Sequence, residues 1–275
     1  MCQKDIKNQW HEKGYFVLPR LFDLAHVTQL RSICDDILEQ WRTSNRLAAS
    51  STVNIMHHLT RIEYFKHAPT RLLALLEVIS DERIISLLEQ LTNRPLLFNN
   101  TQYLFNPMLG GRRLGEWHRD VQFGVLDEEN EQVRMAKIIA IHLHLALLPD
   151  DSLEYVPGSQ NRSDTLEEQQ IRRGLHGKEN TSPEMAGAVR ISLNHGDVLV
   201  FNSWGLHRGR LYDPEKRRSV LDITYGSDQA DWYTPPPTCF SSPAWVSGLK
   251  PQALLFFERF INVYGQRWEK GEYNY

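Results

Sequence analysis

The second half of the chain alternates short β-forming runs with turn residues, and this pattern limits the possible fold more than any other feature. Residues such as Pro157-Gly158-Ser159 and Asn194-His195-Gly196-Asp197 separate the runs with the residue types that tight turns require. The pattern predicts an all-β core of hairpins or Greek-key corners over residues 96–226. The six expected strands lie at 96–105, 138–148, 153–156, 189–193, 198–201 and 219–225.

Helical periodicity dominates the first 95 residues. A short β-like run at 14–19 leads into a helical pattern after Asp23, and Ser80-Asp81 separates two further helices by ending one and capping the next. We therefore expect a single domain over 1–275, mainly β with flanking α-helices. The remaining expected features are a polar insertion at 161–187 with a helix at 166–175, and a C-terminal extension at 227–275 with a helix at 252–264.

Composition excludes several classes of protein. The 31 Lys and Arg against 34 Asp and Glu give a net charge of −3, so no bulk positive field is present to hold nucleic acid or an anionic membrane. The longest apolar stretch, 138–148, is far shorter than the roughly 20 residues that cross a bilayer. Three scattered cysteines and the absence of an apolar export signal favour a cytoplasmic protein. We expect the acidic run at 127–131 to be a solvated loop.

His118-Arg119-Asp120 contains a candidate metal-binding pair. On an extended strand, residues at i and i+2 point to the same face, so His118 and Asp120 would reach one ion. A third candidate ligand, His207, follows the strand run GDVLVFNSW. Two imidazoles and one carboxylate form the facial triad that holds Fe(II) and leaves coordination positions of the iron open for other ligands. The spacing therefore predicts an iron site at His118, Asp120 and His207.

Arg218 is the candidate partner for an acidic ligand at that site. It begins the strand RSVLDITY, which a turn folds back beside the segment that carries His207. A guanidinium in that position can hold a carboxylate in a bidentate fork. Its neighbour Arg217 is an alternative for the same role. Strand alternation places Arg218, Asp222 and Thr224 on one face.

Together these motifs resemble the phytanoyl-CoA dioxygenase family of Fe(II)/2-oxoglutarate oxygenases. The resemblance is carried by GYFVLPRLF near the N-terminus, WHRD at 117–120, YVPGS at 155–159, GDVLVFNSWGLHRG at 196–209 and RRSVLDITY at 217–225. It implies a double-stranded β-helix, or cupin-like jelly roll, over residues 12–226. It also implies that His118, Asp120 and His207 bind Fe(II), that Arg218 binds the distal carboxylate of 2-oxoglutarate, and that O₂ is the oxidant. By the same resemblance, Asn100 or Gln102 lies near the cosubstrate.

The chain departs from the family pattern at several positions. Gln160 stands where relatives commonly have a histidine, and Gly209 stands where they have a serine or threonine two residues after the distal histidine. The second change removes one expected hydrogen bond to 2-oxoglutarate. His142 and His144 share one face of their strand, either as buried, hydrogen-bonded core histidines or as contacts to the substrate.

The function predicted from these residues is hydroxylation of a small-molecule metabolite, with release of succinate and CO₂. Arginines bracket both metal motifs, so we expect an anionic or polar-headed substrate, with Arg113 and Arg210 as its contacts. The alternative is a cupin-like metal protein that is not an oxygenase, such as an isomerase or a small-carboxylate sensor. The arginines in question are Arg112, Arg113, Arg119, Arg208 and Arg210.

Overall fold

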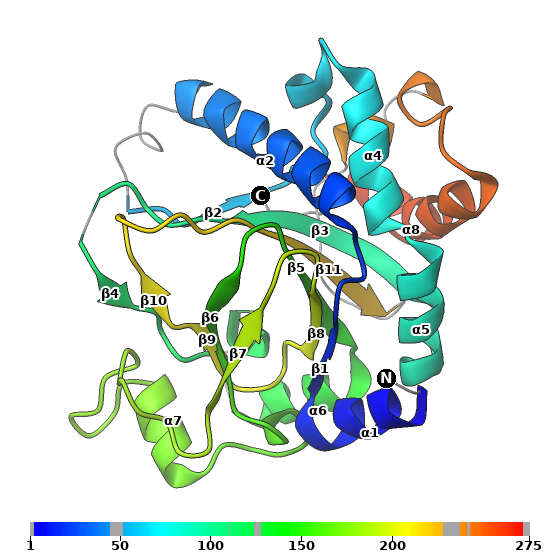
Figure 1. The fold of residues 1–275 in the computed structure, drawn as a ribbon. Coiled ribbons are helices and arrows are strands. Elements are labelled where there is room, and N and C mark those ends of the chain that lie inside the picture. Colours follow the sequence, from blue (N-terminus) through cyan, green and yellow to red (C-terminus); the bar gives the residue numbers. More distant parts are fainter. Residues whose placement is uncertain are drawn as a thin grey trace.

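The structure is a computed structural model that describes residues 3–44, 52–109, 111–123, 128–227, 237–240 and 243–271. Within these residues the strands form antiparallel sheets (Figure 1). A six-stranded sheet has the order β1-β8-β5-β11-β3-β2, a three-stranded sheet has the order β7-β6-β9, and β10 pairs with β4. The strands are β1 (Tyr15–Leu18), β2 (Ile55–His57), β3 (Leu96–Leu104), β4 (Arg113–Leu114), β5 (Ala140–Ala146), β6 (Asp150–Tyr155), β7 (Val189–Leu193), β8 (Val198–Asn202), β9 (His207–Gly209), β10 (Leu211–Tyr212) and β11 (Val220–Ser227).

The six β-runs predicted from the sequence all form strands, and the mainly β fold class is confirmed. Their bounds shift by one or two residues in most cases, while β7 has the predicted bounds. The two main sheets face each other but do not close into a barrel. A buried cluster between them joins side chains of both sheets, including Leu153 and Tyr155 of β6 and Leu199 and Phe201 of β8.

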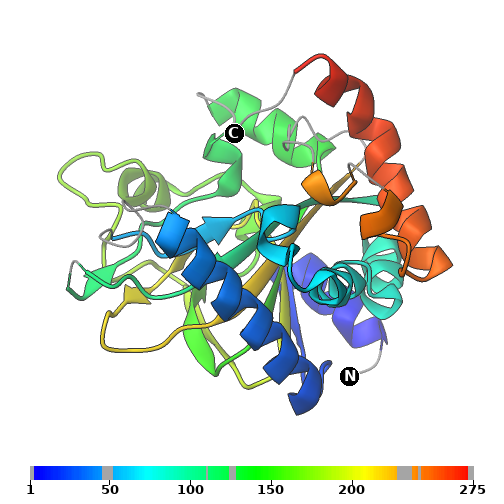
Figure 2. The same ribbon diagram turned by 90° about the horizontal axis from the view of Figure 1, so that it is seen from above.

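Helices cover the outer face of the six-stranded sheet. Figures 1 and 2 show α2, α4, α5 and α8 on one side of the molecule, with α7 on the opposite side. Asp81 caps α5 as predicted, because its side chain accepts a hydrogen bond from the backbone N–H of Arg83. The helices are α1 (Gln3–Lys13), α2 (Leu24–Ser44), α4 (Pro69–Ile79), α5 (Glu82–Thr92), α6 (Glu128–Lys137), α7 (Leu166–Arg172) and α8 (Pro251–Glu269).

The six-stranded sheet has one apolar face and one polar face. On β5, Leu143 and Leu145 join the core beneath the helices, whereas His142 and His144 point to the opposite, inner face. On β11, Leu221 and Ile223 belong to the same helix-covered core. Because successive side chains of a strand alternate between faces, burying the leucines forces the polar residues into the space between the sheets.

The acidic run is the main difference from the predicted organisation. Residues 128–137 form α6, and residues 124–127 lie outside the described residues. Glu131 is 1% exposed and pairs with Arg172 and Arg173, so this part of the run is buried and not solvated. The helix predicted at 252–264 extends to residue 269, and α1 was not predicted.

No helix within the described residues is both long enough and apolar enough to cross a membrane.

Candidate metal and cosubstrate site

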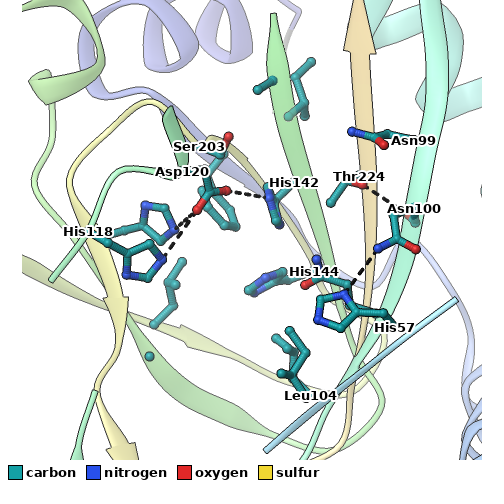
Figure 3. A pocket seen from close by; sticks show the side chains of 18 of the residues that line it. His57, Asn99, Asn100, Leu104, His118, Asp120, His142, His144, Ser203 and Thr224 are labelled. Carbon is teal, nitrogen blue, oxygen red and sulfur yellow. Dashed lines mark hydrogen bonds and ion pairs between the residues drawn. The ribbon is translucent and has the colours of Figure 1, made fainter. Parts of the chain in front are cut away.

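His118, Asp120 and His207 meet at one wall of a cavity of about 530 Å³ between the two sheets. His207 begins β9, and His118 forms an isolated antiparallel bridge with it through two backbone hydrogen bonds of 2.9 Å. Asp120 begins a short 3₁₀ helix directly afterwards. Asp120 Oδ1 lies 3.5 Å from His118 Nε2 and 3.7 Å from His207 Nε2 (Figure 3). The three predicted ligands therefore present one atom each to a common point.

Backbone carbonyls fix both imidazoles in the form that a metal requires. His118 Nδ1 lies 2.8 Å from the carbonyl of Glu116, and His207 Nδ1 lies 2.8 Å from the carbonyl of Gly205. A carbonyl only accepts hydrogen bonds, so each Nδ1 carries the proton and each Nε2 keeps its lone pair. Burial, together with the nearby His118, lowers the pKa of His207 to about 3, which keeps its ring neutral.

His142 holds the other oxygen of Asp120. Its Nε2 lies 2.9 Å from Asp120 Oδ2, and its Nδ1 lies 2.9 Å from Oδ2 of the fully buried Asp222. Burial alone would lower the pKa of His142, but the two carboxylates raise it to about 10. Burial would raise the pKa of Asp120, yet the hydrogen bond from His142 and the surrounding imidazoles hold it below the ordinary range. The pairing leaves Asp120 Oδ1 as the carboxylate atom that faces both Nε2 atoms.

His142, His144 and Asp222 form a second group with metal-ligand spacing, since their donor atoms also lie within 4.8 Å of one another. Both ring nitrogens of His142 face carboxylates, so the ring is an imidazolium without a lone pair for a metal. His144 Nε2 lies 3.2 Å from Asp222 Oδ1, while its buried Nδ1 has no hydrogen-bond partner. This group is therefore a hydrogen-bonded support for Asp120, with one unused polar atom in the cavity wall.

Arg218 and Arg217 point in different directions. Arg218 is 7% exposed, lines the cavity, and donates from Nε to Asp150 Oδ1 at 3.0 Å. Arg217 is exposed and pairs with Asp35 of α2 on the outside of the molecule. Of the two candidates that the sequence left open, Arg218 is the one that faces the cavity.

Asn100 and Gln102 both line the cavity, on β3. The register between β3 and β11 shifts at Thr224 and Tyr225, so Asn99 is an extra residue in the ladder. A bulge of this kind turns an additional side chain towards one face, and Asn99 joins Asn100 and Gln102 in the cavity wall.

The bracketing arginines contact partners outside the cavity. Arg210 pairs with Glu154 at 2.8 Å, and Arg113 donates to the backbone carbonyl of Thr52 while its guanidinium lies over Tyr212. Neither guanidinium lines the cavity. The remaining three are likewise engaged, Arg112 with Asp213, Arg119 with Asp164 and Arg208 with Glu154.

The site also contains residues that the sequence analysis did not select. Asp222 is the partner of both inner-face histidines, and Asp150 holds Arg218. His57 and His58 reach the cavity from the edge strand β2 and the residue after it. The sequence carried a signal only for Asp222, because strand alternation already placed it on the same face as Arg218. Asp150 meets Arg218 by the packing of the two sheets, and His57 meets β3 by sheet pairing, so both contacts join distant segments of the chain.

A sequence model of the phytanoyl-CoA dioxygenase family matches residues 10–219. The chain belongs to this family. Members of the family use Fe(II), 2-oxoglutarate and O₂. No protein among those with curated descriptions matches the sequence significantly.

Solved structures with the same fold support the jelly-roll assignment. HygX from Streptomyces hygroscopicus, with nickel and 2-oxoglutarate bound, has a TM-score of 0.59 and 17% identity, covering 84% of this chain and 88% of its own. EctD from S. alaskensis, with bound Fe, has a TM-score of 0.58 and 17% identity, covering 86% and 80%. The epimerase SnoN, in complex with Fe³⁺, α-ketoglutarate and nogalamycin RO, has a TM-score of 0.55 and 15% identity, covering 86% of each chain.

Arg119 anchors the metal-binding loop to the insertion. Its side chain is 1% exposed and donates to Asp164 and to the carbonyls of Ser159 and Trp204. Asp164 also binds Arg172 of α7 at 2.7 Å. Since Arg119 lies between His118 and Asp120 in the sequence, this buried pairing fixes the backbone that carries both ligands.

Replacing Asp164 should therefore destabilise the whole site. Asp164→Ala leaves two buried guanidiniums short of a counter-charge, so we expect the free energy of unfolding to fall by about 3 kcal/mol or more in chemical denaturation. The control is Asp151→Ala, which breaks an exposed pair with Arg190 and should cost at most about 1 kcal/mol. Equal losses in the two variants would show that the buried network does not anchor the loop.

Proposed function

We propose that this protein is an Fe(II)- and 2-oxoglutarate-dependent oxygenase that hydroxylates a small molecule. The observation that carries the proposal is the convergence of His118, Asp120 and His207 on a cavity that also contains Arg218. When bound, the iron and 2-oxoglutarate supply oxygen activation coupled to oxidative decarboxylation, with succinate and CO₂ as co-products. Halogenation would need a halide bound to the metal, and Asp120 occupies the position that the halide would take. Hydroxylation needs no such additional ligand.

The donor set fits iron. His118 and His207 offer neutral Nε2 atoms, and Asp120 offers an anionic oxygen. Two imidazoles and one carboxylate on one side of an ion leave the other side open to the cavity. His142 donates to the second Asp120 oxygen and so orients the carboxylate, as hydrogen bonds from neighbouring residues do for metal ligands in general.

The other end of the same cavity fits a dicarboxylate. A guanidinium has five N–H donors, and Asp150 accepts from only two of the nitrogens of Arg218. The remaining N–H groups can bind the distal carboxylate of 2-oxoglutarate in a charge-assisted pair.

Tyr212 replaces the hydroxyl group that the sequence lacks at Gly209. A Cβ atom at Gly209 would lie 2.7 Å from the Tyr212 hydroxyl, so the phenol occupies the space of a serine or threonine side chain. Both residues line the cavity. Gly209 pairs with Leu153, beside the segment that carries Asp150, and thus lies between His207 and the partner of Arg218 along the sheet. We infer that Tyr212 donates to the cosubstrate carboxylate.

The metal assignment is tested by iron loading. After anaerobic reconstitution the protein should bind one Fe(II) per chain, and His118→Ala or Asp120→Ala should abolish tight binding, because each removes one of three protein ligands. Metal analysis after desalting measures this. His26→Ala removes an exposed histidine of α2 and should load like the parent. Equal loading by all variants would contradict the ligand assignment.

The role of Arg218 is tested by cosubstrate affinity. Arg218→Ala should weaken 2-oxoglutarate binding at least about tenfold, since a hydrogen bond to a charged group contributes about 1.5–3 kcal/mol. Anaerobic titration of the Fe(II)–2-oxoglutarate absorption band measures the affinity. Arg217→Ala is the matched control and should bind normally. Arg218→Lys keeps the charge opposite Asp150 but not the fork, so it separates loss of the clamp from loss of folding.

The assignment of Tyr212 is tested by moving the hydroxyl. Tyr212→Phe should weaken 2-oxoglutarate binding about tenfold, and adding Gly209→Ser to that variant should restore most of the affinity. The rescue is expected because the new Cβ no longer meets a phenol oxygen and the serine supplies a hydroxyl from the same place. The same anaerobic titration measures the 2-oxoglutarate affinity of both variants. If Tyr212→Phe binds like the parent, the hydroxyl has no role in cosubstrate binding.

A further inference from the structure

Two rows of polar side chains cross the inner face of the six-stranded sheet. In one row, β5, β11, β3 and β2 contribute His144, Asp222, Gln102 and His57, which are direct cross-strand neighbours. In the next row, His142, Thr224 and Asn100 are neighbours in the same way. Figure 3 shows Asn99, Asn100, Thr224 and His57 across the cavity from the metal-ligand candidates. Cross-strand register thus builds a continuous polar floor that begins beneath Asp120.

The floor ends where the Arg218 region begins. One row further along β11, Val220 stands opposite Leu104 of β3 and Ala146 of β5. Leu104 and Leu153 line the cavity near that end. The cavity therefore has an end where leucines surround one guanidinium and the Tyr212 hydroxyl, which suits the cosubstrate, and a polar end over β3 and β2.

The polar end is rich in groups that both donate and accept hydrogen bonds. Asn100 Nδ2 lies 3.3 Å from His57 Nδ1, while its Oδ1 accepts from the backbone N–H groups of Thr101 and His58. The side-chain amide of Gln102 makes no hydrogen bond to the described residues and lines the cavity, so it is available to a ligand. Burying such amides against an apolar chain would cost about 1–3 kcal/mol for each group left unpaired.

The part of the polar end formed by β3 and β2 carries no fixed charge. Apart from imidazoles, the charged side chains among the described lining residues are Asp120 and Arg218, which belong to the metal and cosubstrate ends. Burial lowers the pKa of His57 and lowers that of His58 to about 4, so both rings are neutral near pH 7. An anionic group would find no unpaired counter-charge here, because the neighbouring His142 imidazolium already pairs with Asp120 and Asp222. This end of the cavity therefore favours a neutral ligand.

An exposed aromatic ring lies on the metal side of the cavity. Phe123 is 68% exposed, lines the cavity, and has its ring centre 5.6 Å from that of His118. It offers a flat apolar surface beside the candidate metal ligands, opposite the hydrogen-bonding floor. A molecule that satisfies both walls has polar groups along one edge and C–H bonds on one face.

We propose that the polar end of the cavity binds an uncharged, polyhydroxylated ring compound. Vicinal hydroxyls both donate and accept hydrogen bonds, as the amide, imidazole and threonine groups of the floor do, and Phe123 offers a surface for the C–H face of the ring. The cavity volume of about 530 Å³ is that of a small-molecule site. This inference rests on the proposed oxygenase function and adds the class of substrate to it.

The first test is a panel of probe compounds with the iron-loaded protein under air. Equal sets of neutral glycosides and cyclitols, of sugar phosphates, and of acyl-CoA thioesters are compared for stimulation of succinate formation. We expect a neutral polyhydroxylated compound to give the largest stimulation, with its phosphorylated counterpart weaker. Stimulation chiefly by thioesters or phosphates, or by no neutral compound, overturns the proposal. The Fe(II)–2-oxoglutarate absorption band, which needs no substrate, reports separately whether the oxygenase assignment holds.

The second test uses variants of the floor with the stimulating neutral compound. Thr224→Val and His57→Phe each remove a hydrogen-bonding group with little change of shape, so KM should rise about fivefold with little change in kcat. Thr43→Val is the matched control on the outer surface of α2 and should leave KM unchanged. If KM is the same in both floor variants as in the parent, the floor does not bind the substrate.

Discussion

The ion pairs of His142 with Asp120 and Asp222 connect the metal loop to the largest sheet. Asp120 belongs to a loop held on the small-sheet side by the His118–His207 bridge, whereas Asp222 is fully buried in β11. An imidazolium between two carboxylates compensates charges that burial alone would disfavour. It also selects which oxygen of Asp120 remains for a metal. The orientation of the Asp120 carboxylate therefore depends on the positions of both sheets.

This connection depends on the two-faced character of the six-stranded sheet. The helices α2, α4, α5 and α8 require an apolar surface, and β5 and β11 provide it with alternate residues. The other residues of the same strands then necessarily face the cavity. Asp222 and Thr224 are two residues apart on β11, and Arg218 lies two residues before the strand begins. This short stretch of chain therefore carries the proposed cosubstrate clamp, the support of Asp120 and part of the polar floor in sequence.

Local pattern and motif order predicted most of the fold. The β-runs, the caps of the helices and the ligand motifs are encoded within a few residues each, so a single sequence displays them. The ion pairs of Glu131 with Arg172, and of Arg218 with Asp150, join segments far apart in the chain and have no local signature. For the same reason the partners of the arginines near the metal motifs could not be predicted from the sequence. Their carboxylate partners, such as Asp164 and Glu154, lie in other elements.

The departures from the family pattern follow the division of the cavity into two ends. At the cosubstrate end, Gly209 is tolerated because Tyr212 fills the space and brings a hydroxyl from β10. Under the proposed function, a hydroxyl is still present at this end, but it comes from another residue. At the other end, a bulge in β3 adds Asn99 to the wall, and β2 contributes His57. A fold that keeps its metal loop and its guanidinium fixed can vary these edge positions without disturbing the core, because the helix-covered face carries the packing. Specificity is therefore expected to reside in β2 and β3, and reactivity in β9, β11 and the loop around Asp120.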